Sequence, residues 1–165
     1  MRDVLSFHPT VHGRAVRLAT GRTDLIERND PMSSWSGHGL AFSARPVKPG
    51  QKICLEVRQT DWSRLPGTLR VGFTSQDPNT TWTISSLPSF VIPDLTDTGR
   101  CWAAPVGGGS QINVVLESSA TRAVWDVDGS SRGVLVDGMD CSGPLWLVVD
   151  LYGPVTGLRL VPTGQ

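Results

Sequence analysis

The chain has 165 residues, which is long enough for one domain with a sizeable hydrophobic core. Basic and acidic residues are balanced at 15 each, so the net charge is zero and no broad field attracts nucleic acid or anionic lipid. No run approaches the ~18 apolar residues of a membrane-spanning helix, and the N-terminal MRDVLSFHPT lacks the apolar stretch of a signal peptide. The three cysteines are widely spaced, so we expect free thiols in a reducing, cytoplasmic compartment.

The predicted elements are short β-strands. In KICLEVRQ, for example, alternation places Ile53, Leu55 and Val57 on one face and Cys54, Glu56 and Arg58 on the other. Such alternation is typical of antiparallel strands with one buried face. In chain order, the candidate strands lie within 6–20, 40–46, 52–59, 68–75, 111–118, 121–129, 132–138, 144–153 and 156–162.

Turn signals separate these strands. The pair Asp128–Gly129 is the strongest hairpin signal, because these residues tolerate the positive φ angles of a two-residue hairpin turn. KPGQ at 48–51 and SQDPN at 75–79 are further predicted turns. No segment shows sustained helical periodicity, so the pattern predicts an all-β fold: a single antiparallel β-sandwich of about a dozen strands.

A family resemblance rests on five stretches: FHPTVHGRAVRL, LAFSARPVKPGQKICLEV, GTLRVGFTSQDP, LPSFVIPDLTDTGRCW and GPLWLVVDLYG. In this order and spacing, the chain resembles the Neuralized homology repeat (NHR) domain from Ser6 to Val161. The resemblance implies one concanavalin- or SPRY-like jelly roll across residues 1–165, expected as one domain of a longer multidomain protein. It also implies a non-catalytic domain that recognises a protein or peptide partner, for substrate selection or scaffolding in ubiquitin ligase pathways, with ligase components as candidate partners.

Two other functions stay open. A carbohydrate-binding or carbohydrate-active β-sandwich is one, because this fold type hosts both kinds of protein. The absence of facing carboxylates and of metal ligands in the sequence argues against it. A phosphoinositide-binding peripheral membrane module is the other, because some family members contact phosphoinositides, but zero net charge and scattered arginines argue against membrane contact. We expect no cofactor, no metal and no nucleic-acid partner.

Asp150 is a carboxylate in an apolar strand. In PLWLVVDLYG, it follows five apolar residues in a row. Strand alternation places Leu147 and its odd-numbered neighbours on the core face, and Trp146, Val148, Asp150 and Tyr152 on the other. The matching NHR motif, D-x-YG, implies that this aspartate belongs to the domain in general. We therefore interpret Asp150 as a structural hydrogen-bond acceptor, with ligand contact and catalysis as the weaker alternatives.

Other titratable residues give weak signals for chemistry. Asp126 and Asp128 stand at i and i+2, but no second acidic strand faces them and Asp128 fits a turn. His8 and His12 are too far apart on a strand to share one ion, and Pro9 opposes a helix that would join them. Cys101 has no histidine partner that the sequence can identify. We expect no catalytic residues.

The tryptophans are the best candidates for binding a partner. Trp102 and Trp146 match core positions of the family, whereas Trp35, Trp62 and Trp82 lie in polar, turn-rich stretches. Each of these three either closes the end of the sandwich or anchors an interface, since Trp is enriched in interface hot spots. The predicted partner-binding residues are Trp35, His38, Trp62, Arg64 and Trp82.

Overall fold

The computed structural model describes residues 5–29, 39–59, 68–81, 100–102, 111–117, 122–136, 143–152 and 155–162. These residues form twelve strands and one short helix, in agreement with the predicted fold class. The elements are β1 (Phe7–His12), β2 (Val16–Leu18), β3 (Leu25–Arg28), β4 (Leu40–Ser43), β5 (Lys52–Gln59), β6 (Thr68–Thr74), α1 (Pro78–Thr81), β7 (Arg100–Trp102), β8 (Gln111–Leu116), β9 (Ala123–Val127), β10 (Ser130–Val136), β11 (Trp146–Tyr152) and β12 (Val155–Val161).

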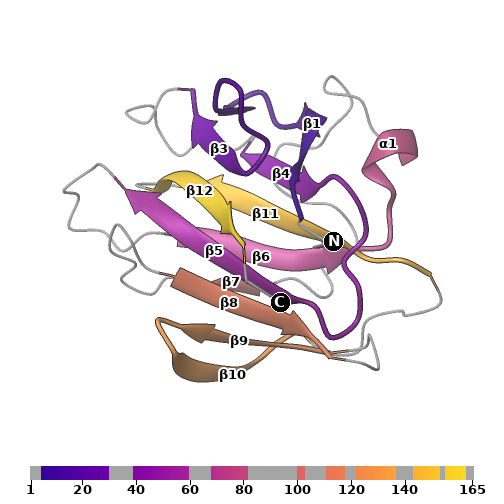
Figure 1. The fold of residues 1–165 in the computed structure, drawn as a ribbon, viewed down its shortest axis with the longest axis vertical. Helices are drawn as coiled ribbons and strands as arrows, with labels where there is room; N and C mark the ends of the chain where they lie inside the picture. Colours follow the sequence, from indigo (N-terminus) through magenta and orange to yellow (C-terminus); the bar gives the residue numbers. More distant parts are fainter. Residues whose placement is uncertain are drawn as a thin grey trace.

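The strands build two antiparallel sheets that pack face to face as a β-sandwich (Figure 1). The five-stranded sheet has the order β1-β4-β11-β6-β7, and the seven-stranded sheet has the order β10-β9-β8-β5-β12-β3-β2. The described residues contain no helix long and apolar enough to cross a membrane.

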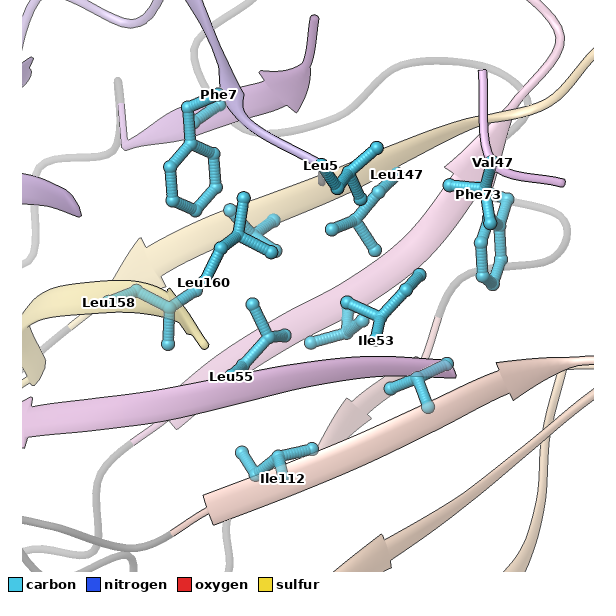
Figure 2. Packing of buried hydrophobic residues seen from close by; sticks show 14 of the residues in the cluster. Leu5, Phe7, Val47, Ile53, Leu55, Phe73, Ile112, Leu147, Leu158 and Leu160 are labelled. Carbon is cyan, nitrogen blue, oxygen red and sulfur yellow. The ribbon is translucent and has the colours of Figure 1, made fainter. Parts of the chain in front are cut away.

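The core lies between the sheets, and strand alternation fills it as predicted. Ile53, Leu55 and Val57 of β5 are all at most 2% exposed, whereas Glu56 and Arg58 face outward. Figure 2 shows leucine, isoleucine and phenylalanine side chains from both sheets meeting in this layer. Burying each such side chain stabilises the fold by about 1.5–3 kcal/mol, so the alternating pattern is the main determinant of the sandwich.

Two predicted turns are confirmed. Asp128 and Gly129 have φ angles of 52° and 85°, and they join β9 to β10 with Val127 paired to Ser130. This is the two-residue hairpin that a DG pair favours. In KPGQ, the amide of Gln51 donates to Lys48 O at 2.9 Å and Gly50 has a φ of 84°.

Three elements were not predicted from the sequence. β3 and β7 are only four and three residues long, too short to show alternation. α1 replaces the expected turn in SQDPN, because Asp77 Oδ1 accepts a hydrogen bond from the amide of Asn79 at 2.8 Å. An aspartate that caps the first turn in this way satisfies an amide that has no partner within the helix.

Candidate functional site

Three pairs of consecutive strands meet at one end of the sandwich, which we call the loop end. There β3, β5 and β11 finish, and β4, β6 and β12 begin. The register brings these ends together, because Asp150 pairs with Leu40, Tyr152 with Thr68 and Val155 with Gln59. The arrowheads of β5 and β11 point to this end, on the left in Figure 1.

The loop end receives two of the predicted binding segments. The connection from β3 to β4 carries Trp35 and His38, and the connection from β5 to β6 carries Trp62 and Arg64. These four residues lie outside the described residues. The strands that flank them nevertheless bring both connections to the same end of the molecule.

The segment that leads into Trp82 lies in a different part of the fold. Trp82 itself lies just outside the described residues, directly after α1, and α1 follows the last residues of β6. That end of β6 is next to the start of β11, where Thr74 pairs with Trp146. α1 therefore lies at the end of the sandwich opposite the loop end, on the right in Figure 1. The sequence alone gave no reason to treat Trp82 differently from Trp35 and Trp62, because only the strand register shows from which end of the sandwich each segment leaves.

Hydrogen bonds fix the chain where it leaves β3. The amide of Asn29 donates to Ala15 O at 2.8 Å, and Asn29 Nδ2 donates to Arg14 O at 2.7 Å. Arg17 Nη1 in turn donates to Asn29 Oδ1 at 3.0 Å. Asn29 is thus held by the turn between β1 and β2, and the connection that follows starts from a defined position.

The chain is fixed equally well where it enters β4. The amide of Leu151 donates to Gly39 O at 3.0 Å, and the amide of Gly13 donates to Leu40 O at 2.7 Å. A Cβ on residue 39 would collide with Leu151 O and would lie 3.1 Å from Asp150 Oδ1. Only glycine allows this close approach of β4 to β11. A glycine directly before an apolar strand was the available sequence signal for this feature, which the sequence reading missed.

Asp150 lies in this tightly packed region. It is 2% exposed, and the register places it between Leu40 of β4 and Arg70 of β6. Arg28, the last residue of β3, is also buried, at 6% exposed. Their burial at the base of the loop end favours the structural interpretation of Asp150, because a carboxylate covered in this way offers almost no surface to a partner.

A second hydrogen-bonded cluster lies at the α1 end. His8 Nδ1 accepts the amides of Thr10 and Val11, at 3.2 and 2.9 Å, so its proton is on Nε2, which donates to Asn79 Oδ1 at 2.7 Å. Asn79 Nδ2 donates to Asp77 Oδ1 at 3.0 Å. The histidine thereby stabilises the irregular register of β1 and ties that strand to α1. These contacts give His8 a structural role.

The acidic pair on β9 serves the hairpin. Asp126 Oδ1 accepts from Asn113 Nδ2 at 2.8 Å and from the amide of Gly129 at 3.1 Å. Asp128 Oδ1 accepts from the amide of Gln111 at 2.7 Å. Both carboxylates therefore fasten β9 and its turn to β8. Over the described ranges, no group of three or more His, Cys, Asp or Glu residues has the geometry of a metal site.

Cys54 is a free thiol, as predicted. It is 7% exposed although it lies on the outer face of the seven-stranded sheet, and burial raises the pKa of its thiol. A raised pKa lowers the thiolate fraction, so this cysteine is poorly suited to nucleophilic chemistry. The side chain of Cys101 and all of Cys141 lie outside the described residues.

The described strands define a β-sandwich in which three strand connections begin and end at the same end of the molecule. The family model described as Neuralized matches residues 7–162, and the chain belongs to this family. It is 33% identical over 175 residues to the human E3 ubiquitin-protein ligase NEURL3, covering 99% of this chain and 62% of that protein. It is 31% identical over 163 residues to Protein neuralized of Drosophila virilis, covering 95% of this chain and 20% of that protein.

Solved structures agree with this assignment. The crystal structure of the Drosophila melanogaster neuralized NHR1 domain aligns with a TM-score of 0.79 at 28% identity, covering 98% of this chain and all of that one. The SPRY domain of human HERC1 aligns with a TM-score of 0.60 at 13% identity, covering 96% of this chain and 99% of that one, which shows the shared fold alone. The chain is an NHR domain, a protein-interaction domain, and it spans between a fifth and two thirds of the length of the relatives named above.

Proposed function

We propose that the loop end recognises a protein or peptide partner and selects or scaffolds it for ubiquitin transfer. The observation that carries this proposal is the register, which delivers the segments bearing Trp35 and Trp62 to one end of the sandwich. A binding surface works best when rigid elements support it. Here the hydrogen bonds of Asn29 and Gly39 supply that support directly beside one of the two segments.

The roles within the site follow from the residue types. Trp35 and Trp62 supply large apolar area at a small cost in conformational entropy, so they act as the anchors. His38 and Arg64 each lie within three residues of one anchor, and they supply polar contacts to the partner. Recognition takes place in the cytoplasm, in keeping with the free thiol of Cys54. We assign ubiquitin transfer itself to a separate ligase module, because this chain covers only 62% of NEURL3, the relative named as an E3 ubiquitin-protein ligase.

The first experiment locates the binding surface. A peptide selected on the parent domain from a phage-displayed library is titrated calorimetrically against Trp35→Ala, Trp62→Ala and Trp82→Ala. At least one of the first two should weaken binding about 30-fold, which corresponds to the hot-spot threshold of about 2 kcal/mol. Trp82→Ala is the matched control, because α1, which directly precedes Trp82, lies at the opposite end.

A thermal melt of each variant accompanies the titration. An exposed anchor contributes little to the core, so the melting temperature should change little in any variant that loses binding. The proposal is wrong if both loop-end variants bind like the parent, or if both simply unfold. Loss of binding in Trp82→Ala alone would move the interface to the α1 end.

The second experiment tests the link to ubiquitin transfer. The domain is fused to a RING module, and the selected peptide is fused to a carrier protein that contains lysines. We expect ubiquitination of the carrier by the parent fusion and little by the fusion of the Trp35→Ala or Trp62→Ala variant that lost binding. Equal ubiquitination by both would show that the loop end does not select the substrate.

A further inference from the structure

A row of valines crosses the outer face of the seven-stranded sheet. Lys52 of β5 pairs with Val115 of β8, Val115 pairs with Val124 of β9, and Val124 pairs with Val134 of β10. Paired residues of neighbouring strands project from the same face of a sheet. Because Ile53 and Val114, which pair next to this row, face the core, the row itself faces outward. We call the three valines the valine stripe.

The valine stripe is accessible. Val134 is 41% exposed and is the one exposed large hydrophobic side chain among the residues that the structure describes. Val115 and Val124 are half-buried. An apolar row on the outer face stands out, because the neighbouring rows of this face carry Asn113 paired with Asp126 and Glu56 paired with Gln111.

Positive charge lies at both ends of the stripe. Lys52 continues the row on β5, and Arg132 precedes Val134 by two residues on β10. Both side chains are exposed, and within the described part of the chain neither forms an ion pair. Glu117, which follows β8, pairs with Arg122 at 3.0 Å, and Glu56 of β5 pairs with Arg159 at 3.2 Å, so arginines already balance both carboxylates. The charge that complements this surface is therefore negative.

We propose that the valine stripe is a second docking surface, for an extended acidic segment of a partner protein in which an apolar residue lies between two carboxylates. Neighbouring strands are about 4.8 Å apart, so β5 and β10 are separated by about 14 Å, the length of about four extended residues. Alternate residues of an extended segment face the same way. Carboxylates at the first and fifth positions thus reach Lys52 and Arg132, while an apolar side chain at the third position meets the valines.

This segment crosses the strands and does not extend the sheet. β10 is the edge of the seven-stranded sheet, but its pairing with β9 shifts register twice and Gly133 has a φ of 80°. Bulges of this kind twist an edge away from further pairing. Recognition therefore depends on the side chains of the stripe, which lies across β8, β9 and β10 at the bottom of Figure 1.

The test uses two synthetic hexapeptides and the isotopically labelled domain, observed by NMR. One peptide has Glu at its first and fifth positions and Ile at its third, and the other has Lys in place of both Glu residues. The Glu peptide should shift the amide signals of β8, β9 and β10, and the Lys peptide should not. In the double variant Lys52→Glu/Arg132→Glu, the Glu peptide should bind about tenfold more weakly and the Lys peptide should gain binding.

Two controls make the result specific. Arg14→Glu/Arg45→Glu changes the net charge by the same amount at exposed sites away from the stripe, and it should keep the parent preference. Val134→Ser removes the exposed apolar contact and should weaken binding of the Glu peptide while the spectrum stays that of a folded protein. The proposal is overturned if the shifts map elsewhere or if the charge swap fails to reverse the preference. It is also overturned if phosphatidylcholine–phosphatidylserine vesicles, and not the Glu peptide, produce the shifts.

Discussion

The outer faces of the two sheets differ in burial and polarity. On the five-stranded sheet, the outer face carries a second buried apolar cluster, and Asp150 and Trp146 of the same face are also buried, at 2% and 5% exposed. The cluster consists of Val11, Leu40, Phe42 and Val148. On the seven-stranded sheet, the outer face carries ion pairs and polar pairs, namely Arg17–Glu27, Arg159–Glu56 and Asn113–Asp126.

This difference shows in the sequences of the strands. β4 reads LAFS and is buried at every position, whereas β8 reads QINVVL and alternates between buried and partly exposed positions. A strand with both faces buried has no reason to alternate polar and apolar residues, but a strand with one solvated face does. The five-stranded sheet is thus packed on both sides, which makes it the rigid layer from which the loop end extends.

The largest expected effect comes from Phe42, on the outer face of the five-stranded sheet. Phe42 is fully buried, so Phe42→Ala should lower the free energy of unfolding by about 3–5 kcal/mol. Val115→Ala, at a half-buried position on the outer face of the other sheet, should cost about 1 kcal/mol or less. Urea denaturation of both variants measures the contrast.

Phe42→Leu is a milder variant at the same position, which is measured in case Phe42→Ala does not fold. It keeps most of the apolar volume and should cost less than about 1.5 kcal/mol. If Phe42→Ala and Val115→Ala cost the same, the two outer faces do not differ in energetic importance, and the five-stranded sheet is not packed on both sides in solution.

Asp150 sharpens the comparison, because it is a carboxylate on the buried outer face. Asp150→Asn removes the charge and one acceptor oxygen from a covered site, so it should lower the free energy of unfolding by about 1–3 kcal/mol. Binding of the selected peptide by the folded protein should be preserved. Chemical denaturation and calorimetry of the same samples separate the two properties.

Asp126→Asn is the matched control on the seven-stranded sheet. Asp126 is half-buried and uses Oδ1 for both of its hydrogen bonds, which an asparagine oxygen can also accept. This variant should cost less than Asp150→Asn. Unchanged stability of Asp150→Asn together with loss of peptide binding would make Asp150 a contact residue and would reverse our interpretation.

Local sequence patterns predicted most of the fold but only part of the candidate site. Alternation predicted the core faces of β5 and β11, and the DG pair predicted the β9–β10 hairpin, because both signals act within a few residues. The packing of Gly39 against Leu151 and the bond from His8 to Asn79 join residues far apart in sequence, so no local pattern reports them. The separation of Trp82 from Trp35 and Trp62 depends likewise on strand register, which propensity does not determine.

The smallest expected effect concerns the ion pair between Arg159 and Glu56, on the solvated face. Arg159 Nε lies 3.2 Å from Glu56 Oε1, and both side chains are 25% exposed. The hydrogen bond from Arg159 is the main cause that lowers the pKa of Glu56 below its ordinary value of 4.5. A carboxylate whose pKa is lowered by folding stabilises the folded state above its unfolded-state pKa. That contribution is lost as the pH falls through the lower folded-state pKa.

Replacing Arg159 should therefore lower the stability only at pH values at which Glu56 is ionised. At neutral pH and low salt, Arg159→Gln should lower the free energy of unfolding by about 0.2–1 kcal/mol, because water screens a partly exposed pair. As the pH falls below the ordinary glutamate pKa, the stabilities of parent and variant should converge, since Glu56 becomes protonated in both. Arg22 likewise lowers the pKa of Asp24, but both proteins retain that pair, so its effect cancels in the difference.

Denaturation curves across this pH range measure the difference in stability between parent and variant, and added salt should shrink this difference at neutral pH. A difference that stays constant with pH and salt would mean that Arg159 stabilises the sheet by packing its aliphatic stem and not by its charge.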